Sequence, residues 1–278
     1  MFSLNCKGKP VLIEKPLVMG ILNLTPDSFY AGSRLQNMDE VFNKACKMIN
    51  EGADILDIGG QSTRPGSERI SKEEEMQKVL PAIEMLIKKF DPVILSIDTY
   101  HSGIAKEAVN AGASIVNDIS GGTMDKNMLE TVASLNVPYI CMHIKGVPET
   151  MHLNASYETV VKEILDFFIQ KINECRLAGI KDVIVDPGFG FGKTVDHNFT
   201  LLKNLSIFKM LERPVMTGIS RKSTIYKTLN IDIEDSLNGT TILNTLALHN
   251  GANILRVHDV KEAKEAVTLF EAYANAKA

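Results

Sequence analysis

DVIVDPGFGFGKT, residues 182–194, decides the fold, because it joins a short apolar run to a polar residue and a glycine-rich turn. It is not a Walker phosphate loop, since the position of that motif's first glycine is Pro187. It is not a dinucleotide loop either, because its glycines alternate as GxGxG rather than GxGxxG. The stretch therefore predicts a strand ending at Asp186 and a tight turn whose glycines let the backbone approach a flat ring.

The same kind of apolar run recurs along the chain. The runs are nearly continuous in hydrophobicity, which is typical of strands buried on both faces of a parallel sheet: 16–22, 53–59, 92–98, 113–118, 137–143, 182–187, 213–219 and 252–258. Apolar residues spaced by three or four predict helices between them, such as 38–52, 73–90, 104–112, 157–179 and 260–276. We therefore expect an α/β protein with a (β/α)8 TIM barrel, in a single domain over 1–278 whose first 15 residues cover the barrel bottom. A doubly wound open sheet is the alternative.

Composition narrows the class of partner. The chain has 278 residues, 45% hydrophobic and 23% charged, with a net charge of -4 and no long Lys/Arg run. We expect neither nucleic acid nor a membrane as a partner, and a small molecule instead. The four cysteines form no CxxC pair, which favours reduced thiols in the cytoplasm.

Polar and glycine-rich residues cluster just after the predicted strands. In a barrel these positions converge on the carboxyl-terminal face, where barrel enzymes build their active sites. Two connections, about 23–37 and 59–72, are longer than the usual ~2–6 residues and indicate substrate clamps. This clustering indicates an enzyme.

Seven strings occur in the order and spacing of one family: GILNLTPDSF, DIGGQSTRPGS, SIDT, VNDISGG, DPGFGFGKT, GISRKS and LRVHDV. From about residue 17 to 260 the chain resembles the dihydropteroate synthase family. The resemblance implies a (β/α)8 barrel and a transferase of folate biosynthesis, which joins (7,8-dihydropterin-6-yl)methyl diphosphate to 4-aminobenzoate and releases diphosphate. It also implies a homodimer formed through outer helices near the C-terminus.

A pterin ring carries N–H donors beside carbonyl and nitrogen acceptors, so its pocket requires a carboxylate, an amide and a cation. By residue type Asp98, Asn117, Asp186 and Lys222 meet this need, although the aspartates are equally typical of strand-end caps or an ion pair with Lys222. The resemblance assigns these four to the pterin, and it adds Met142 and Gly218.

The leaving diphosphate requires cations where negative charge develops. Arg256 and His258 lie two apart on one strand end and point to one side. The resemblance assigns the diphosphate to them together with Asn23 and Thr63, and it implies Mg²⁺ bound by Asn23. The expected catalytic residues are Arg256, His258, Lys222 and Asp98.

The resemblance places Phe29, Arg64, Pro65, Phe191 and Ser223 around 4-aminobenzoate, where sulfonamide drugs would compete. The arylamine is neutral at pH 7 and needs no strong base, which agrees with the lack of a nucleophile triad in the sequence. Ala31 departs from the family, whose first loop carries an acidic residue there, and bears on loop closure and drug sensitivity.

Three other functions remain open at this point. A methyltetrahydrofolate corrinoid methyltransferase shares the pocket carboxylates and asparagine but has no leaving diphosphate. A non-catalytic pterin-binding protein would have an incomplete phosphate site. A Schiff-base aldolase would use Lys222 but has no use for the asparagine and arginine set.

Overall fold

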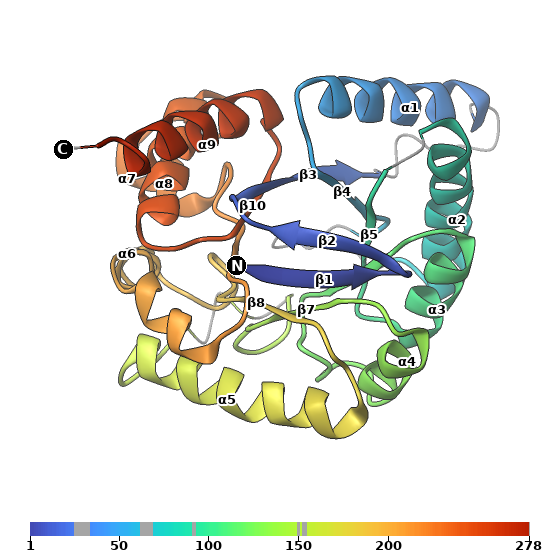
Figure 1. Cartoon of the computed structure of the whole chain (residues 1–278), viewed down its shortest axis with the longest axis horizontal. Helices are drawn as coiled ribbons and strands as arrows, with labels where there is room; N and C mark the ends of the chain where they lie inside the picture. The colour runs from blue at the N-terminus through green and yellow to red at the C-terminus, as the bar shows by residue number, and fades with distance from the viewer. Residues whose placement is uncertain (25–33, 62–68, 91–92, 149–150, 152–154, 278) are drawn as a thin grey trace.

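The computed structural model describes residues 1–24, 34–61, 69–90, 93–148, 151 and 155–277. Within them, after an N-terminal pair of strands, strands and helices largely alternate along the chain, as Figure 1 shows. The strands are β1 (Phe2–Cys6), β2 (Lys9–Ile13), β3 (Leu17–Asn23), β4 (Ile55–Gly59), β5 (Leu95–Asp98), β6 (Ile115–Asp118), β7 (Tyr139–Met142), β8 (Val183–Asp186), β9 (Met216–Thr217) and β10 (Ile254–Val257). The helices are α1 (Arg34–Asn50), α2 (Lys72–Lys89), α3 (Ser102–Ala111), α4 (Met128–Leu135), α5 (Val160–Ala178), α6 (Val195–Lys203), α7 (Ser223–Leu229), α8 (Leu237–His249) and α9 (Val260–Ala274), with 3₁₀ turns η2 (Leu205–Leu211) and η3 (Glu234–Ser236).

Strands β3 to β10 form one parallel eight-stranded sheet in the order β8-β7-β6-β5-β4-β3-β10-β9. The sheet closes between its two ends, because Val185 of β8 pairs in parallel with Val215, the residue before β9. Closure removes both sheet edges and excludes the open doubly wound alternative. The predicted (β/α)8 barrel is confirmed, with helices packed around its outside (Figure 1).

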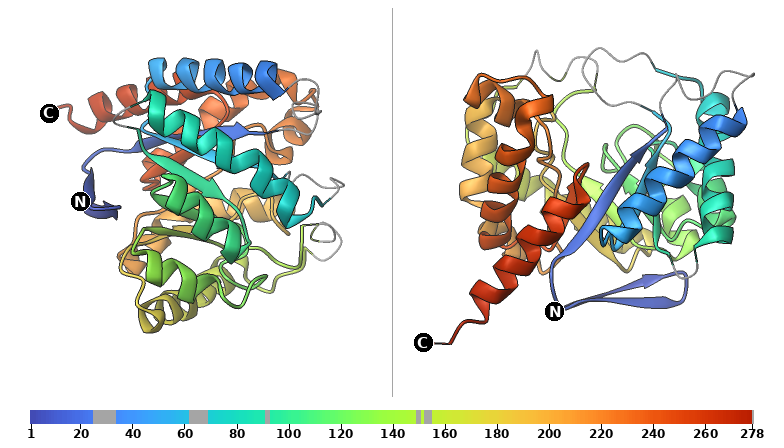
Figure 2. Two further views of the ribbon diagram at one scale, coloured as in Figure 1. Left: turned by 90° about the vertical axis from the view of Figure 1, so that its right-hand side faces the viewer. Right: turned by 90° about the horizontal axis from the view of Figure 1, so that it is seen from above.

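The antiparallel hairpin β1–β2 lies across one end of the barrel (Figure 2). Its Leu4, Cys6 and Ile13 are buried and pack against inward-facing residues of the barrel strands: Leu17, Met19, Ile55, Ile115, Ile140, Ile184, Met216 and Ile254. This cluster fills the amino-terminal end of the barrel with apolar side chains. The opposite, carboxyl-terminal end is therefore the one left for polar chemistry.

A second and larger core lies between the barrel and its helices. It contains the outward-facing strand residues, such as Val18, Leu56 and Leu255, and the buried faces of the helices. Both faces of each strand are thus buried, which explains the nearly continuous apolar runs in the sequence. None of the described helices combines the length and apolar character needed to span a bilayer.

Candidate active site

Inward-facing positions alternate along each strand and change from apolar to polar towards the carboxyl-terminal end. On β4, Ile55 faces the apolar floor and Asp57 comes two residues later. On β8, Ile184 belongs to the floor and Asp186 follows. The same step leads to Asn117 on β6 and Arg256 on β10, whereas on β7 it leads to the apolar Met142. The barrel therefore presents a ring of polar side chains directly above its floor.

Three of these residues, Asp57, Asn117 and Arg256, form one hydrogen-bonded network with Asp98 of β5. Oδ2 of Asp57 accepts from Asn117 Nδ2 at 2.9 Å and from Arg256 Nε at 2.6 Å. Arg256 Nη2 donates to Asp98 Oδ2, also at 2.6 Å. One arginine is therefore held between two carboxylates that come from adjacent strands, β4 and β5.

The network brings a guanidinium and two carboxylates close together in a buried space. Burial raises the pKa of the Asp98 carboxyl to about 7, which the carboxylates of Asp57 and Glu75 reinforce and Arg256 opposes. Burial by itself would lower the pKa of Arg256, but Asp57 and Asp98 raise it above its usual range. Arg256 is therefore a permanent cation, whereas Asp98 changes its charge near neutral pH.

Asp186 and Lys222 lie on the side of the mouth formed by β8 and β9. The Gly188 backbone N–H donates to Asp186 Oδ1 at 2.8 Å, while burial raises the carboxyl pKa and Lys222 opposes that rise. Burial lowers the pKa of Lys222 to about 8, against the effect of Asp186. Lys222 Nζ donates to the Phe189 backbone carbonyl. Gly218 lies beside Lys222, since a Cβ added to this glycine would be 3.7 Å from Nζ. A carboxylate at the end of β8 and an amine at the N-cap of α7 thus lie on the same side of the mouth.

An apolar wall stands next to these polar groups. Met142 and Phe191 are buried in a small cluster with Tyr100, Ile119 and Met151, separate from the two large cores. Lys222 Nζ lies 4.5 Å from the centre of the Phe191 ring, within cation–π range. A flat aromatic ligand would find an apolar surface here with charged groups at its rim.

The glycine-rich turn of residues 186–194 is fixed by Lys193, whose amine is buried. Its Nζ lies 2.9 Å from Gly188 O, 3.0 Å from Phe191 O and 3.0 Å from His143 Nδ1. Burial lowers the pKa of Lys193 well below its usual range, and it lowers that of His143 to about 2. The amine thereby holds the turn that carries Phe191.

Close packing against neighbouring backbone restricts two positions of this turn to glycine. A Cβ on Gly188 would lie 2.0 Å from the His143 carbonyl oxygen, and one on Gly192 would lie 2.5 Å from that of Lys145. Both residues also have positive φ, at 69° and 65°. The glycines therefore allow close packing against the backbone after β7.

On the last strand, His258 directly follows β10 and is half-buried. Ser220 Oγ accepts from the His258 backbone N–H at 3.2 Å and lies 3.0 Å from its Nδ1. Arg221 pairs with Asp259 through two hydrogen bonds of 2.9 and 2.8 Å, and so ties together the loops after β9 and β10. Ser223 is the first residue of α7, beside Lys222.

Asn23 ends β3 with its side chain exposed, in register with Gly59. A Cβ on Gly59 would lie 3.5 Å from Asn23 Oδ1, so the glycine leaves room beside that oxygen. The part of the chain that the structure describes holds no group of three acidic, histidine or cysteine side chains suited to a metal. One amide oxygen fits a Mg²⁺ ion that takes its other ligands from phosphate and water.

Four predicted site residues, Phe29, Thr63, Arg64 and Pro65, lie outside the described residues, as does Ala31. The other predicted residues come together at the barrel mouth: Asn23, Asp98, Asn117, Met142, Asp186, Phe191, Gly218, Lys222, Ser223, Arg256 and His258.

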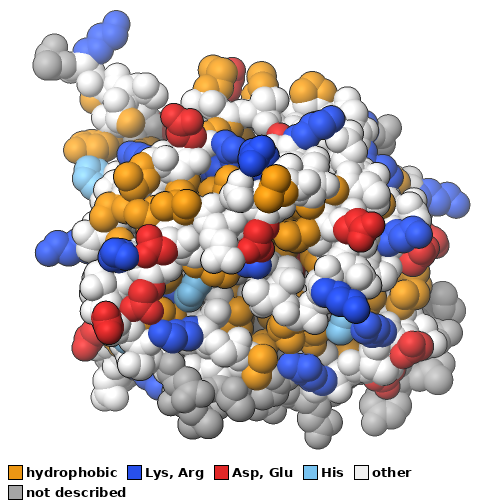
Figure 3. Space-filling model, turned by 90° about the horizontal axis from the view of Figure 1, so that it is seen from below, with side chains coloured by type: hydrophobic (Ala, Val, Ile, Leu, Met, Phe, Trp, Pro, Cys, Tyr) orange, Lys and Arg blue, Asp and Glu red, His pale blue; other side chains and the backbone are white. Residues whose placement is uncertain are grey.

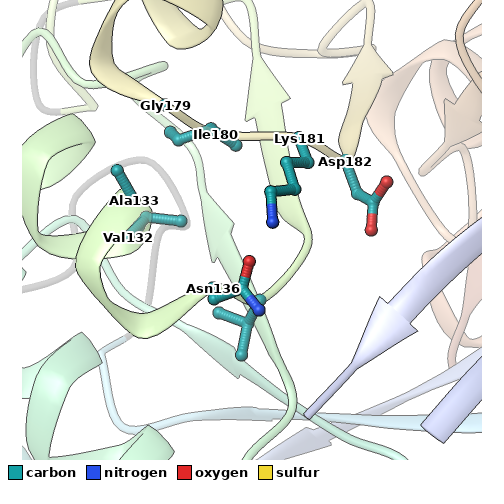
Figure 4. Close-up of a pocket in the computed structure, with 8 residues that line it drawn as sticks. Val132, Ala133, Asn136, Gly179, Ile180, Lys181 and Asp182 are labelled. Carbon is teal, nitrogen blue, oxygen red and sulfur yellow. The ribbon is translucent and has the colours of Figure 1, made fainter. Parts of the chain in front are cut away.

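A small hollow at the other end of the barrel is shown in Figure 4. It is lined by Val132, Ala133, Asn136, Val137, Gly179, Ile180, Lys181 and Asp182, from the ends of α4 and α5 and the start of β8. Asp182 Oδ2 already accepts from the Asn5 backbone N–H of the hairpin at 2.7 Å. The hollow therefore lies far from the polar network and offers no comparable set of groups.

Comparison with known proteins agrees with this geometry. The family model described as pterin binding enzyme matches residues 19–258. The dihydropteroate synthase of Haemophilus influenzae is 41% identical over 276 residues, which cover 99% of this chain and 100% of the relative. The chain belongs to the dihydropteroate synthase family.

Solved dihydropteroate synthases share the whole fold. The structure from Yersinia pestis with a sulfonamide drug complex matches with a TM-score of 0.92 at 40% identity, covering 99% of this chain and 100% of that one. The structure from Xanthomonas albilineans in complex with 7,8-dihydropteroate has a TM-score of 0.89 at 34% identity, with 99% and 100% covered. This membership favours the synthase over the corrinoid methyltransferase, the non-catalytic pterin binder and the aldolase.

Two residues of the dihydropteroate synthase mouth were not among the predicted site residues. Asp57 interrupts an otherwise apolar strand at an inward position, and a carboxylate there was the available signal. Lys193 resembles an ordinary residue at the start of a helix, because Thr194 is the N-cap of α6. Only its contacts with the turn reveal its role.

Proposed function

We propose that the barrel mouth of this dihydropteroate synthase family member joins (7,8-dihydropterin-6-yl)methyl diphosphate to 4-aminobenzoate. The observation that carries this is the convergence of Asp98, Asn117, Asp186 and Arg256 above the apolar floor. The mouth combines acceptors with a permanent cation. The acceptors match the N–H edge of a pterin, and the cation matches its anionic leaving group. The whole chain, 1–278, would act as one domain.

We assign the pterin ring to the carboxylates and the amide of the mouth and to Lys222. Asp186 and Asn117 would accept from the N–H edge, while Lys222 would donate to ring acceptors. Met142 and Gly218 would flank the ring, and Asp98 would complete the acceptor set. The burial that raises the pKa of Asp98 and Asp186 also strengthens their hydrogen bonds to a ligand.

Arg256 and His258 would neutralise the diphosphate as its bond to the methylene carbon breaks, with Asn23 and Thr63 beside them. This charge grows in the transition state, so preorganised cations lower the barrier. Arg256 is preorganised, because two carboxylates fix its guanidinium. Mg²⁺, held by Asn23, would supply further positive charge to the diphosphate oxygens.

The 4-aminobenzoate would lie against Phe191 and Ser223, with Phe29, Arg64 and Pro65 from the two long connections. Its amine nitrogen attacks the methylene carbon, diphosphate leaves with the bonding electron pair, and the nitrogen then loses a proton. No strong base is required, because the arylamine is neutral. The protein's work is positioning, charge neutralisation and exclusion of water.

The test is to incubate purified protein with both substrates and Mg²⁺ and to measure dihydropteroate and diphosphate. We expect both products in equal amounts, and none when 4-aminobenzoate is omitted or Mg²⁺ is chelated. Asp186→Ala is expected to abolish pterin binding, whereas Arg256→Ala would chiefly weaken the diphosphate contacts. Wild-type protein that makes no dihydropteroate would overturn the assignment.

We also propose a homodimer through the outer faces of α7, α8 and α9. These helices expose Leu229, Ile242, Leu246, Leu269 and Tyr273, and exposed apolar side chains in one region favour association. The face in Figure 3 mixes apolar, basic and acidic side chains. Light scattering of wild type and Ile242→Glu would decide between dimer and monomer.

The free thiols of all four cysteines favour the cytoplasm.

A further inference from the structure

Asp57 is fully buried, at 0% exposure, in the layer just above the apolar floor. On the barrel wall it is in register with Ile21 of β3 and Ser96 of β5. One of its oxygens, Oδ2, accepts from both Asn117 and Arg256. Such a buried carboxylate costs free energy unless it is paired, so its place in this mouth calls for a role.

We propose that Asp57 is a positioning residue, which sets the atoms that Asn117 and Arg256 present to the pterin diphosphate. The inference rests on the proposed function, because it takes Asn117 and Arg256 as substrate-binding groups. It deepens that function by assigning selectivity for the pterin amino group to a residue below the ligand.

The chemistry of its amide sets the orientation of the Asn117 side chain. A carboxylate that is paired with a guanidinium accepts hydrogen bonds, so Asn117 turns Nδ2 towards Asp57. Its Oδ1 is then directed away from Asp57, as an acceptor for an N–H donor of the ligand. Asparagine at position 57 could donate as well as accept, and the Asn117 amide could then turn over and present N–H groups to the donor edge.

Two carboxylates hold the Arg256 guanidinium. Asp57 takes Nε and Asp98 takes Nη2, so the planar guanidinium is fixed along two of its edges. Without the charge of Asp57, Asp98 alone would orient Arg256. The guanidinium plane could then rotate about its contact with Asp98. Asp57 therefore controls one group of the pterin pocket and one group of the diphosphate site.

The experiment compares Asp57→Asn with a matched control, Asp118→Asn. Asp118 is equally buried, but it faces outwards, where it accepts from Tyr139 OH and the Ser120 hydroxyl. Binding of hydroxymethylpterin and of its analogue with an oxo group in place of the amino group is measured by calorimetry. We expect the preference of wild type for the pterin to fall about tenfold in Asp57→Asn and to stay unchanged in Asp118→Asn.

Steady-state kinetics supply the second measurement. Asp57→Asn should raise KM for the pterin diphosphate about tenfold or more and lower kcat, with KM for 4-aminobenzoate changed less than about twofold. In an Asn117→Ala background, Asp57→Asn should cause no further loss of pterin selectivity, because the residue through which it acts is gone.

The outcomes separate the two proposals. If wild type makes no dihydropteroate, the proposed function fails, whatever the variants do. If wild type is active but Asp57→Asn weakens pterin and its oxo analogue equally, Asp57 is only structural and the inference is overturned. An additive loss in the Asn117→Ala background would also overturn it.

Discussion

Arg256 Nη2 donates to Asp98 Oδ2 at 2.6 Å, so the cation proposed for the leaving diphosphate is paired with a carboxylate of the proposed pterin pocket. The two residues are 158 positions apart, on β10 and β5. Because Asp57 holds the same guanidinium by Nε, the pterin and diphosphate sites share one rigid element. A substitution of Arg256 should therefore weaken binding at both proposed sites.

Arg256→Lys tests this sharing. Lysine keeps the charge but cannot donate in a planar fork to Asp57 and Asp98 together. We expect kcat/KM for the pterin diphosphate to fall about a hundredfold, with KM for 4-aminobenzoate changed less than about twofold. Steady-state kinetics with each substrate varied will measure this. A loss below about threefold would show that charge alone suffices.

Lys222 should cause kcat/KM to fall on the alkaline side, or limb, of its pH profile. Burial lowers its pKa to about 8, so the ammonium loses its proton as pH rises through that value. We expect kcat/KM for the pterin diphosphate to fall about tenfold per pH unit above the limb. Lys222→Arg should lower the rate but move the limb above about pH 9.5. An unchanged limb in the variant would assign it to another group.

Lys193→Met should loosen the turn of residues 186–194. The Gly188 and Phe191 carbonyls would lose their donor, which we expect to cost about 1–3 kcal/mol of unfolding free energy. KM for 4-aminobenzoate should rise, because Phe191 lies on this turn. Urea unfolding and kinetics are the measurements, with Lys203→Met on the exposed face of α6 as the control. Equal stability of the two variants would contradict the contacts.

Glu75 on α2 is buried, with no partner for its Oε1 among the described residues. Burial raises its pKa to about 7, from an ordinary value of 4.5. The folded state therefore holds this proton more tightly than the unfolded state, and the resulting stability is present below pH 4.5 and lost as pH rises through 7.

Glu75→Gln removes this dependence. We expect the free energy of unfolding of the variant minus that of wild type to be about 3 kcal/mol larger at about pH 8 than at about pH 4.5. Comparing the two pH values cancels the packing cost of the amide. Urea unfolding at both values provides the measurement, and a pH-independent difference would show that Glu75 is ionised in the folded protein.

Several elements could be predicted because their signals are local. Burial on both faces of each strand leaves a continuous apolar run, and all eight barrel strands follow from such runs. The seventh run, 213–219, contains the short β9, since only Met216–Thr217 pairs as a strand. Helix α8 lacked a clear signal, because Gly239, Thr240 and Asn244 are buried polar or small residues in its apolar stripe.

The sequence by itself determined the barrel class, the strands and most residues at the mouth, because periodicity and strand-end polarity depend on neighbours along the chain. The tertiary structure decided the pairings at that mouth. Asp57 meets Asn117 and Arg256 from 60 and 199 residues away, and Lys193 meets His143 from 50. These contacts depend on strand register and on closure of the barrel, which set the height of each inward side chain and bring both ends of the sheet together.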